Sequence, residues 1–184
     1  MATSVAATRN LSGLARALAQ HGIMSEYEAD AAQTQAQTAN VTFAEQVLAG
    51  KRMTAQQLAV FASRAFGVPL LDLASFEIEQ INKEYIDSKI AASRRVLPLH
   101  RRGNRLYVAT SDPANLQALE EVRFKTNLIV EPVVVEDDKL GAAIHKLIES
   151  SGATLQELAS MDELEVDLVD GADELEDDDE TADA

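Results

Sequence analysis

The chain has 184 residues, a formal net charge of −15 and no cysteine, and 46% of its residues are hydrophobic. This composition suffices for one domain or two small ones, and the missing cysteines exclude a disulfide framework and a thiolate metal site. No apolar run approaches the ~20 residues that cross a bilayer, and the N-terminus lacks the pattern of a secretory signal. We expect a cytoplasmic protein that does not insert into a membrane.

The negative charge is concentrated at the C-terminal end. Residues 161–184 carry 13 acidic side chains and no Lys or Arg, which leaves a net charge of −2 for residues 1–160. A segment this acidic and without aromatic residues cannot bury enough apolar surface to offset the entropy of ordering. We predict a disordered acidic linker or tail over residues 151–184, and a flexible N-terminus over residues 1–9.

Start and stop signals of helices fill the chain before residue 70. The first predicted helix has four apolar residues with helical spacing, followed by a glycine placed as a left-handed cap. These residues are Leu11, Leu14, Ala15, Leu18 and Gly22. Three more helices are predicted to begin at capping boxes, in which two side chains three positions apart satisfy free helix amides. The boxes are Ser25 with Glu28, Thr42 with Glu45, and Thr54 with Gln57.

These helices form an internal repeat with a period of 29 residues. Leu14, Leu18, Met24, Ser25 and Glu28 recur as Phe43, Val47, Met53, Thr54 and Gln57. Duplicated units of this size bury their apolar faces against each other. We therefore predict a helical interaction subdomain over residues 10–73, with four helices in a duplicated helix-turn-helix. A bundle without a ligand site is favoured over a small-molecule site.

Strands and helices alternate over residues 74–150, which predicts an α+β fold with a small three-stranded α/β sandwich. The predicted elements are a helix near residues 82–91, strands over 96–100 and 105–110, a helix, a strand over 128–135 and a helix over 137–148. Gly103 and Asn104 between the first two strands both tolerate positive φ, which indicates a hairpin.

The helix between the second and third strands has its own start signal. Asp112 is predicted to cap it, with Pro113 as the first helical residue. Its apolar residues are predicted to be buried in varying degree. They are Leu116, Leu119, Val122 and Phe124.

No residue pattern predicts catalysis, a cofactor or a metal. A nucleotide-binding P-loop needs G-x-x-x-x-G-K-[ST], but Gly50-Lys51 is followed by Arg52, and Glu45 replaces the first glycine. The three histidines, at positions 21, 100 and 145, have no partner at helical spacing, which argues against a zinc or nucleophile–base site. We expect this chain to lack Walker motifs and enzyme activity.

Five arginines form the only basic cluster of the sequence, around the first strand. They are Arg94, Arg95, Arg101, Arg102 and Arg105. Solvated strand and turn charges are favoured over phosphate contacts, because no aromatic residues are interleaved with them. We predict no nucleic-acid partner.

Four motifs between Leu58 and Ile148 resemble the N-terminal domain of the secretion and pilus assembly ATPases, the GspE and PilB family. They are G-h-P-h-h-D-L at 67–73, the run R-R-V-L-P-L at 94–99, h-x-V-A-x-x-D-P at 106–113 and h-R-F-x-T at 122–126. The resemblance implies the regulatory front of a type IV pilus extension ATPase. Its nucleotide-binding domains are then expected beyond Ala184, with the acidic tail as the linker to the motor.

The helical repeat is similar to the tandem elements by which some of these ATPases bind cyclic di-GMP, with the pattern R-L-G-x-x-L-V-x-x-G-L-L. The matching residues are Leu14, Leu18, Gly22, Ile23 and Met24. Gly13 and Ala15 replace the arginine and first glycine of the first copy, and Thr42, Ala44 and Lys51 replace the corresponding Arg and Gly residues of the second. A repeat that keeps its helices and loses its ligand groups is a candidate protein-binding module. The alternative is direct binding of cyclic di-GMP across the repeat.

The resemblance implies a set of partners for a docking domain that controls pilus extension and twitching motility. They are a PilZ-domain adaptor, through it a FimX-like cyclic di-GMP receptor, the pilus inner-membrane platform and the motor domains of the same chain. The protein would be recruited to the cytoplasmic face of the inner membrane. The predicted partner surface combines a flexible Met and an amphipathic Tyr with an apolar face, although that face is equally suited to be core. Its residues are Leu11, Leu14, Leu18, Met24 and Tyr27.

Overall fold

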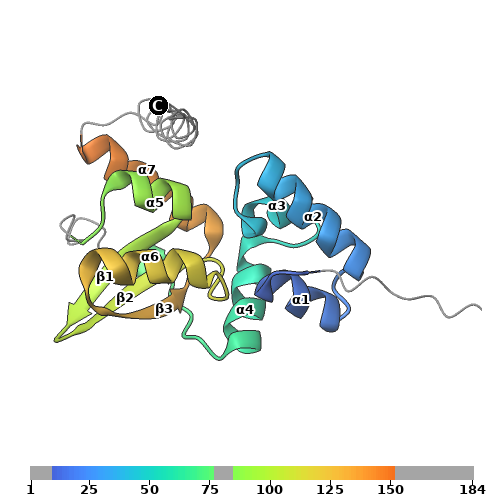
Figure 1. The fold of residues 1–184 in the computed structure, drawn as a ribbon, viewed down its shortest axis with the longest axis horizontal. Helices are drawn as coiled ribbons and strands as arrows, with labels where there is room; N and C mark the ends of the chain where they lie inside the picture. Colours follow the sequence, from blue (N-terminus) through green and yellow to red (C-terminus); the bar gives the residue numbers. More distant parts are fainter. Residues whose placement is uncertain (1–9, 77–84, 152–184) are drawn as a thin grey trace, which may run out of the picture.

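The computed structural model of the chain describes residues 10–76 and 85–151. Four helices, α1 to α4, occupy one side of the molecule, and a three-stranded sheet with helices α5 to α7 occupies the other (Figure 1). The predicted α+β fold, a helical part followed by a small three-stranded sandwich, is confirmed. The predicted flexible N-terminus and the acidic segment after Ser151 lie outside the described residues.

The helical half consists of α1 (Gly13–Gln20), α2 (Glu26–Thr38), α3 (Phe43–Ala49) and α4 (Ala55–Phe66). All three predicted capping boxes are formed, with the hydroxyls of Ser25, Thr42 and Thr54 accepting the amide of the third helical residue. The turns before α2 and α4 share a left-handed residue, Gly22 with φ +69 and Lys51 with φ +53. The duplicated helix-turn-helix is therefore a structural repeat.

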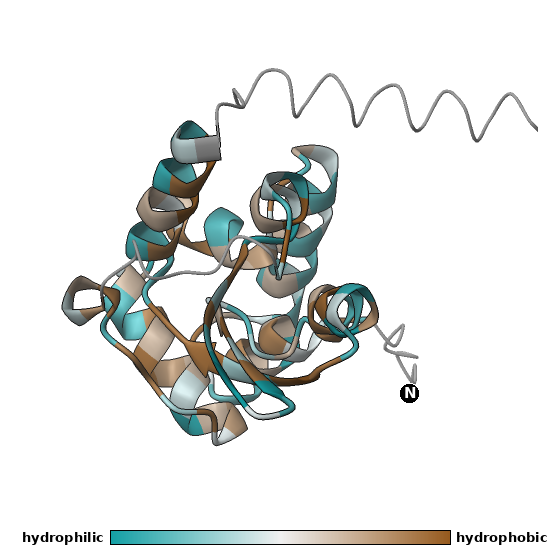
Figure 2. Cartoon of the chain, turned by 90° about the vertical axis from the view of Figure 1, so that its left-hand side faces the viewer, coloured by the Kyte–Doolittle hydropathy of each residue, from teal (hydrophilic) through white to brown (hydrophobic). Residues whose placement is uncertain are grey.

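The second half contains the 3₁₀ helix η1 (Leu73–Ser75), α5 (Ser88–Arg94), β1 (Val96–Arg102), β2 (Arg105–Thr110), α6 (Leu116–Thr126), β3 (Ile129–Val134) and α7 (Asp137–Ser151). The strand order is β1-β2-β3, with β1 antiparallel and β3 parallel to β2. Helix α7 buries its apolar residues on one face of the sheet, and α6 buries Ala118 and Val122 on the other. The strands, mostly brown in Figure 2, thus form the middle of three layers.

Both edge strands contain a proline. Pro98 lies in β1, next to an irregularity of its pairing with β2, and Pro132 lies in β3. A proline donates no hydrogen bond, so both edges are poor templates for pairing with another strand. The sheet is therefore protected against edge-to-edge association.

The predicted hairpin between the first two strands is confirmed, with Gly103 at positive φ in its turn. Two other predictions for the second half are wrong in detail. Helix α5 begins at Ser88, where Asp87 accepts the amide of Ile90 at 2.8 Å, and ends at Arg94; residues 82–84 of the predicted helix lie outside the described residues. Helix α6 begins at Leu116 and is capped by Asn115, because Asp112 closes a separate turn before it.

The predicted burial of α6 is wrong at its two ends. Leu116 is 65% and Phe124 is 82% exposed, whereas Leu119 and Val122 are buried. The helix presents Ala118, Leu119 and Val122 to the sheet. A residue two positions away from this face points about 200° around the helix, which places Leu116 and Phe124 in solvent.

Candidate functional site

The segment after α4 joins the helical half to the sheet by strand-like pairing. The amide of Leu71 donates to the carbonyl of Val134 at 2.9 Å, and the amide of Val134 donates to the carbonyl of Pro69 at 2.8 Å. Val134 is fully buried and belongs to the same apolar cluster as the helices of the first half. Helix α4 lies between the other helices of the first half and the sheet (Figure 1). The two halves therefore share part of their core.

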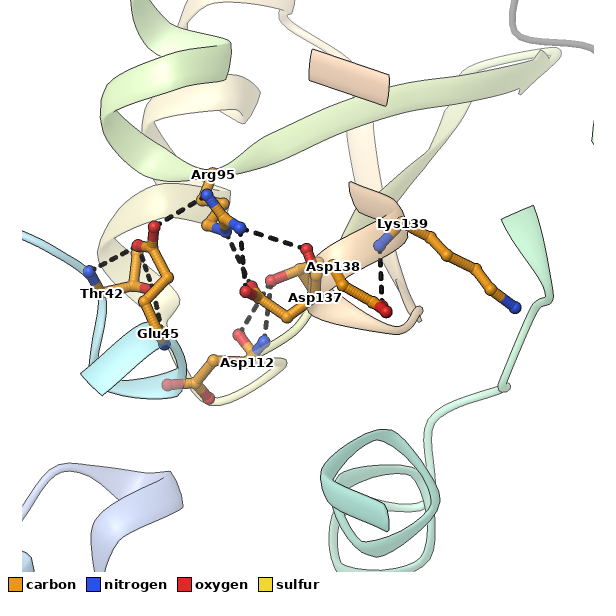
Figure 3. Close-up of polar contacts among 8 residues, drawn as sticks. Thr42, Glu45, Arg95, Asp112, Asp137, Asp138 and Lys139 are labelled. Atoms are coloured by element: carbon orange, nitrogen blue, oxygen red, sulfur yellow. Dashed lines mark hydrogen bonds and ion pairs between the residues drawn. The ribbon is translucent and has the colours of Figure 1, made fainter. Parts of the chain in front are cut away.

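A half-buried arginine forms a second connection between the halves (Figure 3). Arg95 follows α5 in the left-handed conformation, with φ 51 and ψ 56, which turns its side chain toward α7 and α3. Its Nε and Nη2 donate to the two carboxylate oxygens of Asp137 at 2.8 and 2.9 Å, and its Nη1 pairs with Glu45 at 2.8 Å. Glu45 also accepts the amide of Thr42. One guanidinium thus links the cap of α3 to the start of α7.

The ion pairs of Arg95 are poorly accessible to water. The side chains of Arg95, Asp137 and Glu45 are 21%, 6% and 27% exposed. Burial lowers the pKa of Arg95, but the hydrogen bonds and charge of Asp137 and the charge of Glu45 outweigh it, so that the pKa lies above its ordinary value. Gly141 leaves room for this arrangement, since a Cβ atom there would lie 2.6 Å from Nη2 of Arg95.

The third connection is a close approach of two backbones. A Cβ atom added to Gly13, the first residue of α1, would lie 2.6 Å from the Cβ atom of Ala114 in the turn before α6. Carbon atoms at van der Waals contact lie about 3.5–4 Å apart. The absence of a side chain at position 13 therefore sets the distance between the two halves at this point.

We expect Gly13→Ala to destabilise the fold by about 1–3 kcal/mol, because neither Cβ atom can move without its backbone. The midpoint of urea unfolding measures the effect. The double variant with Ala114→Gly removes the opposing Cβ atom and is expected to recover most of the loss. A Gly13→Ala variant as stable as the parent chain would contradict the close packing of the halves here.

The outer side of the helical repeat carries a groove of about 760 Å³. It runs along α4 between the two equivalent turns of the repeat, and we call it the repeat groove. It is lined by His21, Ile23, Arg52, Met53, Gln56, Gln57, Val60, Phe61, Arg64 and Ala65. Apolar side chains and two arginines dominate this lining, and no acidic residue of the described chain takes part in it. The groove suits an occupant that is both apolar and negatively charged.

The polar side chains of the repeat groove differ in how firmly they are held. The Nδ1–H of His21 donates to the carbonyl of Ala17 at 2.9 Å, and its ring stands edge-on against Phe61 with centroids 5.2 Å apart. Arg52 pairs with Glu28 at 2.6 Å, and this contact, together with the capping hydrogen bonds of Glu28, lowers the pKa of that carboxyl to about 2. No hydrogen bond or ion pair joins the Arg64 side chain to another described residue.

The predicted partner surface is largely core. Leu11, Leu14, Leu18 and Met24 are at most 7% exposed and belong to the apolar cluster of the helical half. Their burial supports the alternative interpretation, in which the face holds the repeat together. Tyr27 is 68% exposed and is the residue of the five that a partner can reach.

The interpretation of the basic cluster as solvated charges is wrong for Arg95. Arg94 pairs with Glu121 and Arg105 with Glu131, both within partly exposed pairs, and only Arg95 is enclosed between the halves. No local pattern marks Arg95 as different from Arg94. The sequence did not indicate that Arg64 and Phe61 line a groove, because their helical spacing also fits a buried face.

No group of three or more His, Cys, Asp or Glu side chains within residues 10–76 and 85–151 could hold a metal ion. No helix in these ranges is long and apolar enough to cross a membrane.

Comparisons with known proteins place the chain in a family. A family model of the MshEN domain matches residues 66–154. The type IV pilus assembly ATPase PilB of Pseudomonas aeruginosa is 39% identical over 176 residues, which cover 95% of this chain and 31% of that protein. The chain is an N-terminal domain of the type IV pilus and secretion ATPase family. PilB of Acinetobacter baylyi is 47% identical over 83 residues, 45% of this chain and 14% of that protein.

The chain spans about a third of the length of the P. aeruginosa ATPase and less of the other PilB proteins that it matches. The MshEN match begins at the last residue of α4, so that the helical repeat precedes it. The junction residues Arg95 and Asp137 lie inside the matched domain, whereas the repeat groove lies before it.

Solved structures share the fold at low sequence identity. A structure of MshE with cdg, cyclic di-GMP, has a TM-score of 0.52 and 23% identity, covering 72% of this chain and 96% of that one. The N-terminal domain of XpsE has a TM-score of 0.56 and 16% identity, covering 72% of this chain and 91% of that one. At these identities the likeness establishes the fold alone.

Proposed function

We propose that the chain is a noncatalytic regulatory and docking domain of a type IV pilus assembly ATPase, with subdomains over residues 10–73 and 74–150. The helical repeat binds a PilZ-type adaptor and, through it, a FimX-like cyclic di-GMP receptor. Its other partners are the motor domains of the same protein, which hydrolyse ATP, and the pilus inner-membrane platform. It acts at the cytoplasmic face of the inner membrane. Adaptor binding then controls pilus extension and twitching motility.

The observation that carries this proposal is the 39% identity to a pilus assembly ATPase over 95% of the chain. The surface of the repeat supports the choice of the docking half. Tyr27 is exposed on α2. Arg52 lines the repeat groove and also a second, smaller pocket that Tyr27 lines. The three connections fix the helical repeat to the sheet. A movement of the repeat on adaptor binding would therefore also move the sheet.

Direct binding of cyclic di-GMP is the second candidate, because a structural neighbour, MshE, was solved with that nucleotide. The residues of this chain favour the adaptor over the nucleotide. Gly13 and Thr42 stand where the nucleotide-binding pattern has arginine, and Ala114 packs within contact distance of Gly13. Titration of the chain with cyclic di-GMP is expected to give no heat of binding, and saturable heat would favour the sensor instead.

We expect Tyr27→Ala to weaken binding of a PilZ-type adaptor by about 10–30-fold, the effect of removing an aromatic anchor from an interface. Isothermal titration of the 184-residue chain with the purified adaptor measures the change. Tyr27 is exposed, so its removal is expected to change the free energy of unfolding by no more than about 0.5 kcal/mol.

Phe124→Ala is the matched control for this variant. It removes an aromatic side chain that is 82% exposed on the other half of the molecule. Adaptor affinity is expected to stay unchanged. Equal losses for the two variants would contradict an interface confined to the helical repeat, and no adaptor binding by the parent chain would refute the docking function.

A further inference from the structure

An occupant of the repeat groove must match two chemical properties of its lining at once. Ile23, Met53 and Phe61 offer apolar surface, while Arg64 offers a positive charge that no described residue neutralises. Arg52, the other arginine of the groove, already forms an ion pair with Glu28. An occupant with apolar residues only would leave Arg64 solvated by water alone. One with carboxylates only would leave the apolar floor exposed.

The sequence of this chain contains a segment with both properties. Residues 162–170 read DELEVDLVD, with five carboxylates and no basic residue. Leu164, Val166 and Leu168 alternate with Glu165 and Asp167. In an extended chain, alternate side chains point to opposite sides. One side of this segment would then be apolar and the other acidic, which is the pattern that complements the repeat groove.

The segment is also within reach of the groove. Helix α7 starts beside it, since Asp137 and Asp138 line a smaller pocket together with Arg52 and Met53. The 15 residues of α7 extend about 22 Å from that point. Ten residues, 152–161, connect the end of α7 to the segment and span up to ~33 Å when extended. This connection is long enough to return the chain to α4.

We propose that residues 162–170 bind in the repeat groove of the same chain, with their apolar side chains on its floor and their carboxylates toward Arg64 and Arg52. The acidic segment is then an internal competitor for the surface that the adaptor uses, and this regulatory consequence rests on the proposed function. Tethering supplies an effective concentration of about 1 mM for a short flexible connection. A segment that binds with a Kd of ~0.1 mM as a separate peptide would weaken adaptor binding about tenfold.

Methyl NMR of the 184-residue chain and of a chain ending at residue 160 tests the contact. The truncation leaves all described residues in place. The methyl resonances of Ile23 and Met53 are expected to differ between the two chains, whereas that of Ile129, exposed on β3 away from the groove, is expected to coincide. A triple Leu164→Ser, Val166→Ser, Leu168→Ser variant keeps every charge and is expected to give the spectrum of the truncated chain.

Arg64→Gln in the 184-residue chain is expected to move the groove resonances toward those of the truncated chain. Coincident Ile23 and Met53 resonances in the 184-residue and truncated chains would overturn the proposal. Differences that grow with chain concentration would also overturn it, because they assign the segment to a second copy. Truncation is expected to tighten adaptor binding. Equal adaptor affinity of the two chains would exclude the regulatory role of the segment. If neither chain binds the adaptor, the docking function is refuted, and the NMR spectra still show whether the segment contacts the groove.

Discussion

Arg95→Met is expected to destabilise the folded chain by about 3–5 kcal/mol, the loss found when one partner of a buried ion pair is removed. The variant leaves the carboxylate of Asp137, which is 6% exposed, without its two guanidinium hydrogen bonds. Glu45 loses its contact with the sheet half at the same time. Urea unfolding followed by circular dichroism measures the free energy of unfolding.

Arg94→Met is the matched control, because Arg94 precedes Arg95 in the chain and also forms an ion pair, with the single carboxylate of Glu121. The side chains of Arg94 and Glu121 are 37% and 31% exposed. Partly exposed pairs contribute at most about 1 kcal/mol, so the control is expected to lose no more than that. Similar losses for the two variants would contradict the special position of Arg95.

Gly141 provides a second check on the same contact. In the parent chain, Gly141→Ala forces the Arg95 guanidinium away from α7 and is expected to lower stability. In the Arg95→Met background the side chain that opposes the Cβ atom is gone. There the higher helix propensity of alanine is expected to raise stability by about 1 kcal/mol. If Gly141→Ala lowers the free energy of unfolding in the parent chain and raises it in the Arg95→Met variant, the Arg95 side chain packs on Gly141.

The features predicted correctly from the sequence are local ones. Each capping box depends on residues three positions apart, which is why Ser25, Thr42 and Thr54 were predicted as helix starts without knowledge of the fold. The hairpin around Gly103 and the order of strands and helices depend on neighbours in the same way. The repeat was found because its period keeps the same residue classes at the same positions.

The features that escaped prediction depend on residues far apart in the sequence. The contact of Arg95 with Glu45 spans 50 positions, and the contact of Gly13 with Ala114 spans about twice as many. Helical spacing indicates an apolar face but not whether that face meets another helix or water. For this reason Leu14 and Leu18 were equally consistent with core and with a partner surface, and only packing decides between them.

Asp112 shows how a correct local prediction can be shifted by the surrounding fold. Its side chain does cap backbone amides, since Oδ1 accepts the amide of Ala114 at 2.9 Å, but it does so in the turn before α6 instead of at the helix start. It is 8% exposed. Burial raises the pKa of Asp112 to about 6, against a smaller lowering by the amides of Ala114 and Asn115. The folded chain therefore binds a proton at this site more tightly than the unfolded chain.

Asp112→Asn is expected to stabilise the fold at pH 7 by about 1–3 kcal/mol, since one pKa unit corresponds to about 1.4 kcal/mol and asparagine is uncharged at every pH. The ordinary pKa of Asp, 3.8, applies to the unfolded chain, and about 6 applies to the folded one. Because the folded pKa is the higher, the stability gained from protonation is complete below about pH 4 and is lost as the pH rises through 6. The advantage of the variant is thus expected to shrink by about 1 kcal/mol between pH 7 and pH 5.

Urea unfolding of the parent chain and the Asp112→Asn variant at both pH values separates this effect from other titrations, because only the difference between the two proteins is compared. The control is Asp138→Asn, which removes an exposed carboxylate at the start of α7. Its difference in free energy of unfolding from the parent chain is expected to be the same at pH 7 and pH 5. A constant difference between the Asp112→Asn variant and the parent chain would mean that the carboxyl of Asp112 does not change its protonation in the folded state over this range. Its burial in the turn would then be offset by hydrogen bonds stronger than those of Ala114 and Asn115.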